Sequence, residues 1–187
     1  MKNWLAASLA LVAMAGCASK NPEAVDLKGT WKHTAENGIS GGKDEETFIV
    51  AAKGNKFNIT TQTGTDESKR VYDGQTLYSK SPYDETARTV KETEISSERF
   101  WANAMTQGSG EAGGIVAGRD AMLYQVRQKR PDGELTQQIW VDAKTGVMLK
   151  STLTIYSSQI NSMVRKEDWE CLAIDFSPVE DTAFSKP

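Results

Sequence analysis

Alternation of apolar and polar residues is the main structural signal in this chain. The clearest case runs over residues 27–34, where one face would carry Leu27, Gly29, Trp31 and His33. A period of two is the pattern of a half-buried β-strand, because successive side chains of a strand point to opposite faces. The segment is therefore predicted to be a strand with one apolar face.

Turn residues then divide the chain into further strands. Gly54-Asn55 separates the runs 47–53 and 56–62, and Asp73-Gly74 separates 69–72 from 75–79. Tight hairpin turns favour such pairs because their central residues take positive φ.

Two more turn signals lie in the second half of the chain. The sequence Arg-Pro-Asp-Gly at 130–133 lies between runs 121–129 and 134–142, and residues 142–146 precede the run 147–156. Residues 163–176 are predicted to add one more strand. Four hairpin signals in succession predict an antiparallel meander.

One segment has helical spacing. Between Ser97 and Gln107 the apolar residues are three or four positions apart, with Ser96 available as an N-cap and Gly108 as a stop. Residues 84–94 are polar and are expected to form a loop or a weakly amphipathic turn. The glycine-rich connector up to Gly118 is expected to be mobile, so that helix and connector would act as a lid.

The fold class predicted from these elements is mainly β (α+β). It is a curved antiparallel meander sheet or half-barrel, with one or two short helices as a lid. Residues 27–187 are long enough for a single domain with a sizeable core.

The N-terminus has the layout of an export signal. Lys2 precedes an apolar stretch from Trp4 to Ala15 that only Ser8 interrupts. The stretch is about a dozen residues long, whereas a helix that crosses a membrane needs about 20. Residues 1–16 are therefore predicted to be a cleaved signal peptide rather than a membrane-spanning anchor.

The residues that end this stretch are more specific. Val12-Ala13-Met14-Ala15-Gly16-Cys17 resembles the lipobox of bacterial lipoproteins, which implies that Cys17 carries acyl chains such as palmitate. Ala18 follows the cysteine, and by resemblance to lipoprotein sorting rules this implies the outer membrane, facing the periplasm. Residues 17–26 would be a polar, lipidated tether. The alternative is ordinary cleavage after Ala15, which would leave a soluble periplasmic protein with a free cysteine.

The net charge and the cysteine content limit the kinds of partner and the disulfides that can be expected. Without Lys2 the mature chain carries 21 of the 22 Lys and Arg residues against 25 Asp and Glu, a net charge of −4. Because both signs are interspersed, we expect no nucleic-acid partner. With Cys17 lipidated, Cys171 has no partner for an intramolecular disulfide, and it is expected to be buried or to pair between chains.

Two segments resemble the lipoprotein-carrier half-barrel superfamily that includes LolA, LolB and RseB. They are Val-Tyr-Asp-Gly-Gln-Thr-Leu-Tyr at 71–78 and Ile-Trp-Val-Asp-Ala-Lys-Thr-Gly-Val-Met-Leu-Lys at 139–150, and Ile-Asp-Phe-Ser-Pro at 174–178 also fits. The resemblance implies a strongly curved sheet around an apolar cavity that takes up acyl chains, closed on its open side by helices.

Catalytic residues are scarce in the sequence. His33 is the only histidine, so a two-histidine metal site cannot be built. The acidic run at 44–46 has no calcium-loop spacing and is expected to be a solvated turn. We therefore expect no enzyme activity, no metal and no cofactor. A hydrolase stays a minor alternative that would need titratable groups clustered in a cleft.

Apolar residues on the predicted strands and helix are the candidate ligand-binding set. An apolar sheet face must be covered by helices, by a second sheet or by a ligand. An eleven-residue helix spans only about 16 Å, too little for a sheet of this size. The alternative is that the sheet curls and these residues pack on one another, and alternation leaves the direction of Trp140 open. The candidates are Trp31, Phe48, Phe57, Ile59, Phe100, Trp101, Met105, Tyr124 and Trp140.

The sequence thus favours an outer-membrane-anchored lipoprotein that binds a hydrophobic ligand. The ligand would be a lipid, an acyl chain or a lipidated polypeptide, with a role in lipoprotein sorting. The alternative is a non-enzymatic envelope sensing or protein-interaction module that uses the sheet as a scaffold, with Arg127, Lys129 and Arg130 as a candidate contact.

Overall fold

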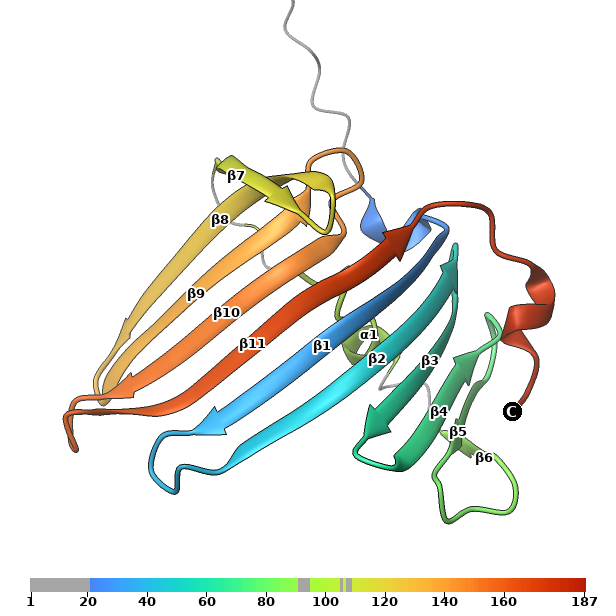
Figure 1. Ribbon diagram of the computed structural model, residues 1–187, viewed down its shortest axis with the longest axis horizontal. Coiled ribbons are helices and arrows are strands. Elements are labelled where there is room, and N and C mark those ends of the chain that lie inside the picture. Colours follow the sequence, from blue (N-terminus) through green and yellow to red (C-terminus); the bar gives the residue numbers. More distant parts are fainter. Residues whose placement is uncertain (1–20, 91–94, 105, 107–108) are drawn as a thin grey trace, which may run out of the picture.

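The protein folds into one open, antiparallel sheet of eleven strands. The computed structural model describes residues 21–90, 95–104, 106 and 109–187, and Figure 1 shows the sheet face-on. The strand order is β6-β5-β4-β3-β2-β1-β11-β10-β9-β8-β7. Two meanders, β1 to β6 and β7 to β11, are therefore joined edge to edge by the first and last strands of the chain. The predicted mainly β, curved antiparallel fold is confirmed.

The strands vary in length from three residues to fourteen. In chain order they are β1 (Leu27–Asn37), β2 (Lys43–Lys53), β3 (Lys56–Thr63), β4 (Asp66–Tyr72), β5 (Leu77–Lys80), β6 (Arg88–Val90), β7 (Glu111–Val116), β8 (Arg119–Arg130), β9 (Gly133–Asp142), β10 (Met148–Ser157) and β11 (Ser162–Asp175). The helical elements are the short turns η1 (Pro22–Ala24), α1 (Ile95–Glu98) and η3 (Asp181–Phe184).

The pairing of β1 with β11 closes the middle of the sheet. It runs from Lys28 opposite Asp175 to Asn37 opposite Arg165, with a bulge between Thr30 and Trp31. These strands are at opposite ends of the domain sequence, and no local turn connects them. The alternation predicted each strand but gave no indication that they are neighbours.

The predicted tight turns are present. Gly54 has a φ of +55°, and Gly54-Asn55 is the whole connection between β2 and β3. Asp73 accepts hydrogen bonds from the backbone N–H groups of Gln75 and Thr76, both at 2.8 Å, and so fixes the turn between β4 and β5. Local turn chemistry is sufficient to set these hairpins.

The predicted helix over residues 97–107 is wrong. Helix α1 ends at Glu98, and the chain then makes a single turn in which Ala102 and Asn103 donate to the carbonyl of Arg99. The carbonyl of Trp101 accepts instead from the N–H of Met148 at 2.8 Å. Contacts with the sheet therefore replace the intrahelical bonds that would have continued the helix.

The glycine-rich connector is also more ordered than expected. Residues 111–116 form β7, which pairs with β8. A Cβ at Gly110 would lie 2.7 Å from the ring of Tyr124, and one at Gly113 would lie 2.9 Å from the ring of Trp140. Glycine here permits close backbone packing rather than mobility.

The segment 84–94 was expected to be a loop or a weakly amphipathic turn, and the structure describes it up to residue 90. Its residues 88–90 form strand β6, which the sequence pattern did not predict.

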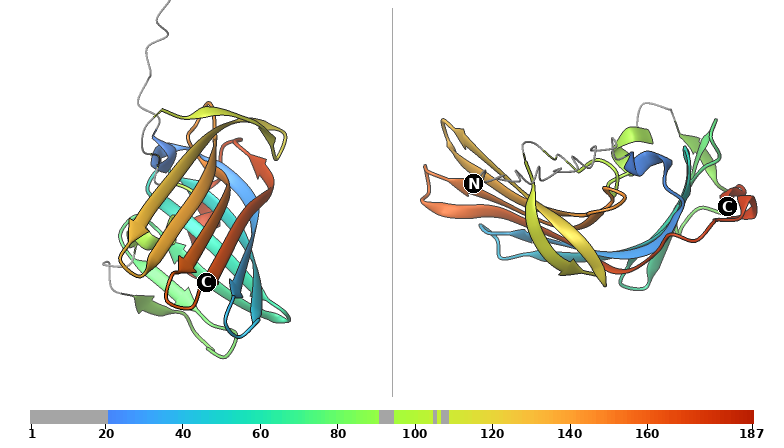
Figure 2. Two further views of the ribbon diagram at one scale, coloured as in Figure 1. Left: turned by 90° about the vertical axis from the view of Figure 1, so that its left-hand side faces the viewer. Right: turned by 90° about the horizontal axis from the view of Figure 1, so that it is seen from above.

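The sheet is strongly curved, and its two faces differ. Seen from above in Figure 2, it forms an open trough with α1 and η1 inside the curve and the C-terminal tail on the outside. The main hydrophobic core lies on the concave side. Among the described residues no helix is long and apolar enough to cross a membrane. The described strands and hydrophobic clusters belong to residues 21–187, so this part contains the described pairings and core contacts of the sheet.

Candidate ligand-binding face

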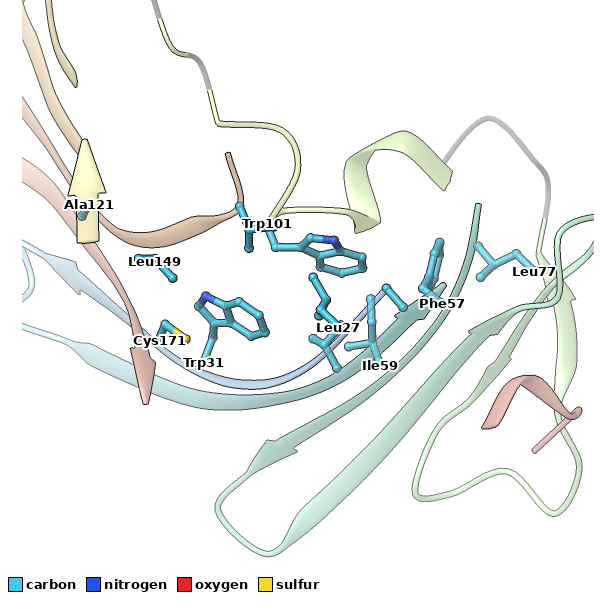
Figure 3. Close-up of a cluster of buried hydrophobic side chains, with 12 residues drawn as sticks. Leu27, Trp31, Phe57, Ile59, Leu77, Trp101, Ala121, Leu149 and Cys171 are labelled. Carbon is cyan, nitrogen blue, oxygen red and sulfur yellow. The ribbon is translucent and has the colours of Figure 1, made fainter. Parts of the chain in front are cut away.

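Trp31 lies at the centre of the concave face. It is fully buried, and its indole N–H donates to the carbonyl of Met148 at 3.0 Å. Figure 3 shows Trp31 beside Leu27, Leu149 and Cys171, with Trp101 above it. The hydrogen bond ties β1 to the start of β10 across the intervening strand β11.

Residues 95–104, called here the covering segment, place Phe100 on the aromatic side chains of the sheet. The Phe100 ring stacks on Trp169 with centroids 4.4 Å apart, and it meets Trp31 edge-on at 5.5 Å and Phe48 at 5.4 Å. Aromatic pairs in these geometries contribute about 0.5–1.5 kcal/mol each beyond their area burial. The segment is therefore part of the core.

Polar contacts fasten the covering segment near its middle, at Glu98 and Arg99. Glu98 is ion-paired with Arg70 on β4. The Arg99 guanidinium donates to the carbonyl of Asn55, lies 3.6 Å from the carboxylate of Glu23, and sits 5.7 Å from the ring centroid of Phe57. The predicted lid is thus present as a fastened, irregular strap rather than a helix.

His33 lies at the edge of the aromatic cluster, between two carboxylates. Its ring stacks on Trp169 with centroids 4.2 Å apart. Its Nδ1 lies 3.4 Å from Glu46, and its Nε2, which is buried without a hydrogen-bond partner in the described chain, lies 3.9 Å from Glu167. Polar groups therefore begin on the concave face where the covering segment ends.

The concave face continues beyond the covering segment over β8 to β11. The strand register places five further apolar residues on the same face as Ile139 and Trp169, because directly opposite residues of an antiparallel pair share a face. Their side chains are only partly buried. This partly exposed apolar area, called here the open concave surface, consists of Tyr124, Val126, Leu135, Leu153 and Ile155.

The convex face is mostly polar, but it also has an apolar depression. A hollow of about 480 Å³ lies over β11, β1, β2 and β3 and includes Ile49, Ala51 and Ala173. Beside it the C-terminal tail packs Val179 and Phe184 against Val71.

The structure places the predicted binding residues in three different environments. Trp31, Phe57, Ile59 and Trp101 are buried in the core. Phe48, Phe100 and Tyr124 are partly buried on the concave side. Trp140 pairs with Leu123 and Lys150, so it faces the convex side, where the Lys150 ammonium lies 5.1 Å from its ring. Met105 and Cys17 lie outside the described residues.

Sequence reasoning missed several residues of this face. Trp169 stacks on both His33 and Phe100, and Leu135 and Ile155 belong to the open concave surface. The available signal for Trp169 was its position two residues before Cys171 on one predicted strand. That signal needed the β1–β11 register before it could place Trp169 beside His33.

Cys171 lies in surroundings that suppress the reactivity of its thiol. Burial raises the pKa of the Cys171 thiol to about 12, and its Sγ donates to the carbonyl of Ala173 at 3.4 Å. A thiol with such a pKa is a poor nucleophile at neutral pH. Among the described residues, no group of three or more His, Cys, Asp and Glu side chains could hold a metal ion.

Asp142 is a buried carboxylate with a structural role. Burial opposes its ionisation, yet the hydrogen bonds from Arg119 at 2.8 Å and from the Thr145 N–H at 2.7 Å hold the pKa of Asp142 below its ordinary value. The same carboxylate accepts from the N–H of Lys144 at 3.0 Å. It therefore fixes the turn between β9 and β10.

Comparisons with known proteins give structural neighbours only. No family model and no curated protein matches the chain. A LolA superfamily protein from Nitrosomonas europaea is 10% identical, with a TM-score of 0.45 over 89% of this chain and 94% of that one. An outer membrane lipoprotein-sorting protein domain from Vibrio parahaemolyticus is 9% identical, with a TM-score of 0.36 over 86% and 89%.

A third neighbour is a DUF1329 family protein from Desulfovibrio piger, 12% identical, with a TM-score of 0.39 over 87% of this chain and 90% of that one.

Proposed function

We propose that the protein binds a hydrophobic ligand on its concave face and performs no reaction. The ligand class is an acyl chain, carried by a lipid or by a lipidated polypeptide. The observation that carries the proposal is the open concave surface, where five apolar side chains on the three neighbouring strands β8, β9 and β10 stay partly exposed beside a buried aromatic cluster.

The apolar side chains of the open concave surface are only partly covered by the protein, so a ligand can bury them further. Burying apolar surface contributes about 25 cal/mol per Å², or roughly 0.8 kcal/mol per methylene. An alkyl chain needs no directional bonds, so the Gln137–Ser151 hydrogen bond of 3.1 Å on the same face does not have to be broken. The aromatic cluster under Phe100 would become available only if the covering segment moved.

We further propose that the domain is held at the outer membrane by acyl chains on Cys17, facing the periplasm, after removal of residues 1–16. This rests on the lipobox-like residues 12–17. Intact-mass analysis of the mature protein checks it, since lipidation adds the mass of the acyl chains at Cys17. A mature chain that begins at Gly16 or Cys17 without added mass would overturn this part of the proposal.

The direct test is titration of residues 21–187 with a fluorescent fatty acid. Saturable binding is expected, and Leu153→Glu on the concave side should weaken it by roughly tenfold or more, because a charge would replace apolar contact area. The matched control is Thr152→Glu, one residue away on the convex side. Absence of saturable binding, or equal losses in both variants, would contradict the proposal.

A second candidate function is a protein-interaction module of the envelope. Lys129 and Arg130 are exposed beside the turn between β8 and β9, whereas Arg127 is ion-paired with Glu134. Crosslinking in cells separates the two functions, since a stable protein partner combined with no fatty-acid binding would support this one.

A further inference from the structure

Three hairpin turns form a continuous rim at one end of the sheet. They are the β8–β9 turn, the β10–β11 turn and the β1–β2 turn, and Figure 1 shows them side by side at the end opposite η1. The Ser158 N–H donates to the carbonyl of Asp132 at 2.9 Å, which joins the first two. The Gly38 N–H donates to the carbonyl of Val164 at 3.2 Å, which joins the last two.

Large apolar side chains project from this rim into solvent. Ile39 at the β1–β2 turn is 72% exposed, Ile160 at the β10–β11 turn is 54% exposed, and Tyr156 is 38% exposed. These are three of the seven large apolar residues that are exposed in the described chain. Single exposed apolar residues are ordinary, but a row of them on adjoining tips indicates a contact surface.

The turns hold these side chains in fixed positions. The Asn37 side chain accepts hydrogen bonds from the N–H groups of Ile39 at 3.0 Å and Ser40 at 3.1 Å. At the neighbouring tip, Asn161 has a φ of +48° and its side chain is hydrogen-bonded to the Tyr156 hydroxyl. The isoleucines are thus presented by closed, hydrogen-bonded turns.

Cations lie on the hairpin that adjoins the Ile160 tip, whereas the hairpin of Ile39 carries Lys43 together with the carboxylates of Glu36 and Asp44. Lys129 and Arg130 are exposed at the end of β8, and Asp132 is an exposed carboxylate in the β8–β9 turn that follows them. The carbonyl of Asp132 accepts from the Ser158 N–H of the neighbouring β10–β11 turn. Arg127 and Glu134 neutralise each other. The β8–β9 hairpin end therefore has an excess of one positive charge.

From these observations we propose that the rim inserts Ile39 and Ile160 into a lipid surface that contains anionic headgroups. A protein partner would need a pocket that is complementary in shape to the protruding isoleucine side chains. A lipid interface has no such requirement and can bury aliphatic side chains of any shape. The basic residues of the β8–β9 hairpin, beside the Ile160 tip, would meet lipid phosphates. This contact is separate from the concave face and from Cys17.

The test is sedimentation of residues 21–187 with vesicles, once of phosphatidylcholine alone and once with phosphatidylglycerol added. The wild-type domain should bind, and more strongly to the anionic vesicles. The double variant Ile39→Ser/Ile160→Ser should lower the partition coefficient roughly tenfold or more. Lys129→Gln/Arg130→Gln should lower binding to anionic vesicles only.

The matched control is Ile115→Ser. Ile115 is 75% exposed on β7, away from the rim, and the same change there should leave vesicle binding unaltered. Because all these side chains are exposed, thermal unfolding should be nearly unchanged in each variant. The proposal is overturned if the wild-type domain binds neither vesicle, if the double isoleucine variant binds as well as wild type, or if Ile115→Ser loses as much.

Discussion

The indole N–H of Trp31 and the backbone carbonyl of Met148 lie 3.0 Å apart, although 117 positions separate the two residues in the sequence. This hydrogen bond links the two meanders on the concave side, in addition to the β1–β11 pairing. It is buried, so its loss would leave a carbonyl without a partner in the core.

Trp31→Phe should therefore lower the free energy of unfolding by about 1–3 kcal/mol, since it retains an aromatic ring but leaves Met148 unpaired. Chemical denaturation of residues 21–187 measures this. Trp140→Phe is the control, because Trp140 is only partly buried on the convex side, and its cost should be smaller. Equal costs would mean that the Trp31 hydrogen bond adds nothing.

The ion pair between Glu98 and Arg70 fastens the covering segment to β4 and lies outside the open concave surface. It is nevertheless predicted to influence the affinity for the ligand. If the covering segment competes with the ligand for the aromatic cluster, Glu98→Gln should raise the population of the uncovered state. The apparent Kd for a fluorescent fatty acid should then fall about two- to fivefold, while the unfolding free energy drops by at most about 1 kcal/mol.

The control for this prediction is Glu134→Gln, which breaks the ion pair with Arg127 at the far end of β9. It should leave the Kd unchanged. A fatty-acid affinity that is insensitive to Glu98→Gln would show that the ligand binds without displacing the segment.

Gly29 lies against the indole ring of Trp31, and replacing it by a larger residue is predicted to destabilise the fold. A Cβ added there would lie 2.5 Å from the six-membered ring of Trp31. Gly29→Ala should therefore cost about 1–3 kcal/mol of unfolding free energy through overpacking. The exposed Gly42, whose φ is not positive, offers a matched Gly→Ala change that should be nearly neutral. Thermal unfolding of the two variants gives the comparison.

Cys171 should make stability depend on alkaline pH. Its folded-state pKa is about 12, above the ordinary value of 9.0, so the folded state retains the proton when the unfolded state has lost it. The resulting stabilisation is complete below pH 9 and is lost between pH 9 and 12, at about 1.4 kcal/mol per pH unit. Relative to Cys171→Ala, the wild-type domain should lose unfolding free energy as pH rises through this window. Parallel pH profiles would contradict the predicted thiol burial.

The hairpins could be predicted from the sequence because their determinants are local. Gly54-Asn55, Asp73-Gly74 and the residues around Asp142 specify turns through positive φ or side-chain hydrogen bonds within a few residues. The β1–β11 pairing could not be predicted, since it joins the two ends of the domain. The surroundings of the candidate residues could therefore be predicted only in part, because the partners of Trp31 and His33 depend on that pairing.

The helix prediction was wrong for a related reason. The spacing of Phe100, Trp101 and Ala104 imitates a helical face, but these residues cover the aromatic side chains of the sheet in an irregular strap. Trp140 illustrates the limit of alternation, because a period of two identifies two faces without saying which is concave. The register with Lys150 resolves this, and it places Trp140 on the convex side, where it packs against the margin of the main hydrophobic cluster.

The central claim is that an alkyl chain lies on the concave face of the sheet, and paramagnetic NMR tests it most directly. A fatty acid with a nitroxide near its chain end would be added to residues 21–187, and methyl line widths would be compared. Broadening is predicted for Val126, Leu135, Leu153 and Ile155 on the concave side, with sharp signals retained for Ile49 and Val71 on the convex side. Broadening confined to Ile49 and its neighbours, or none at any methyl group, would contradict the account.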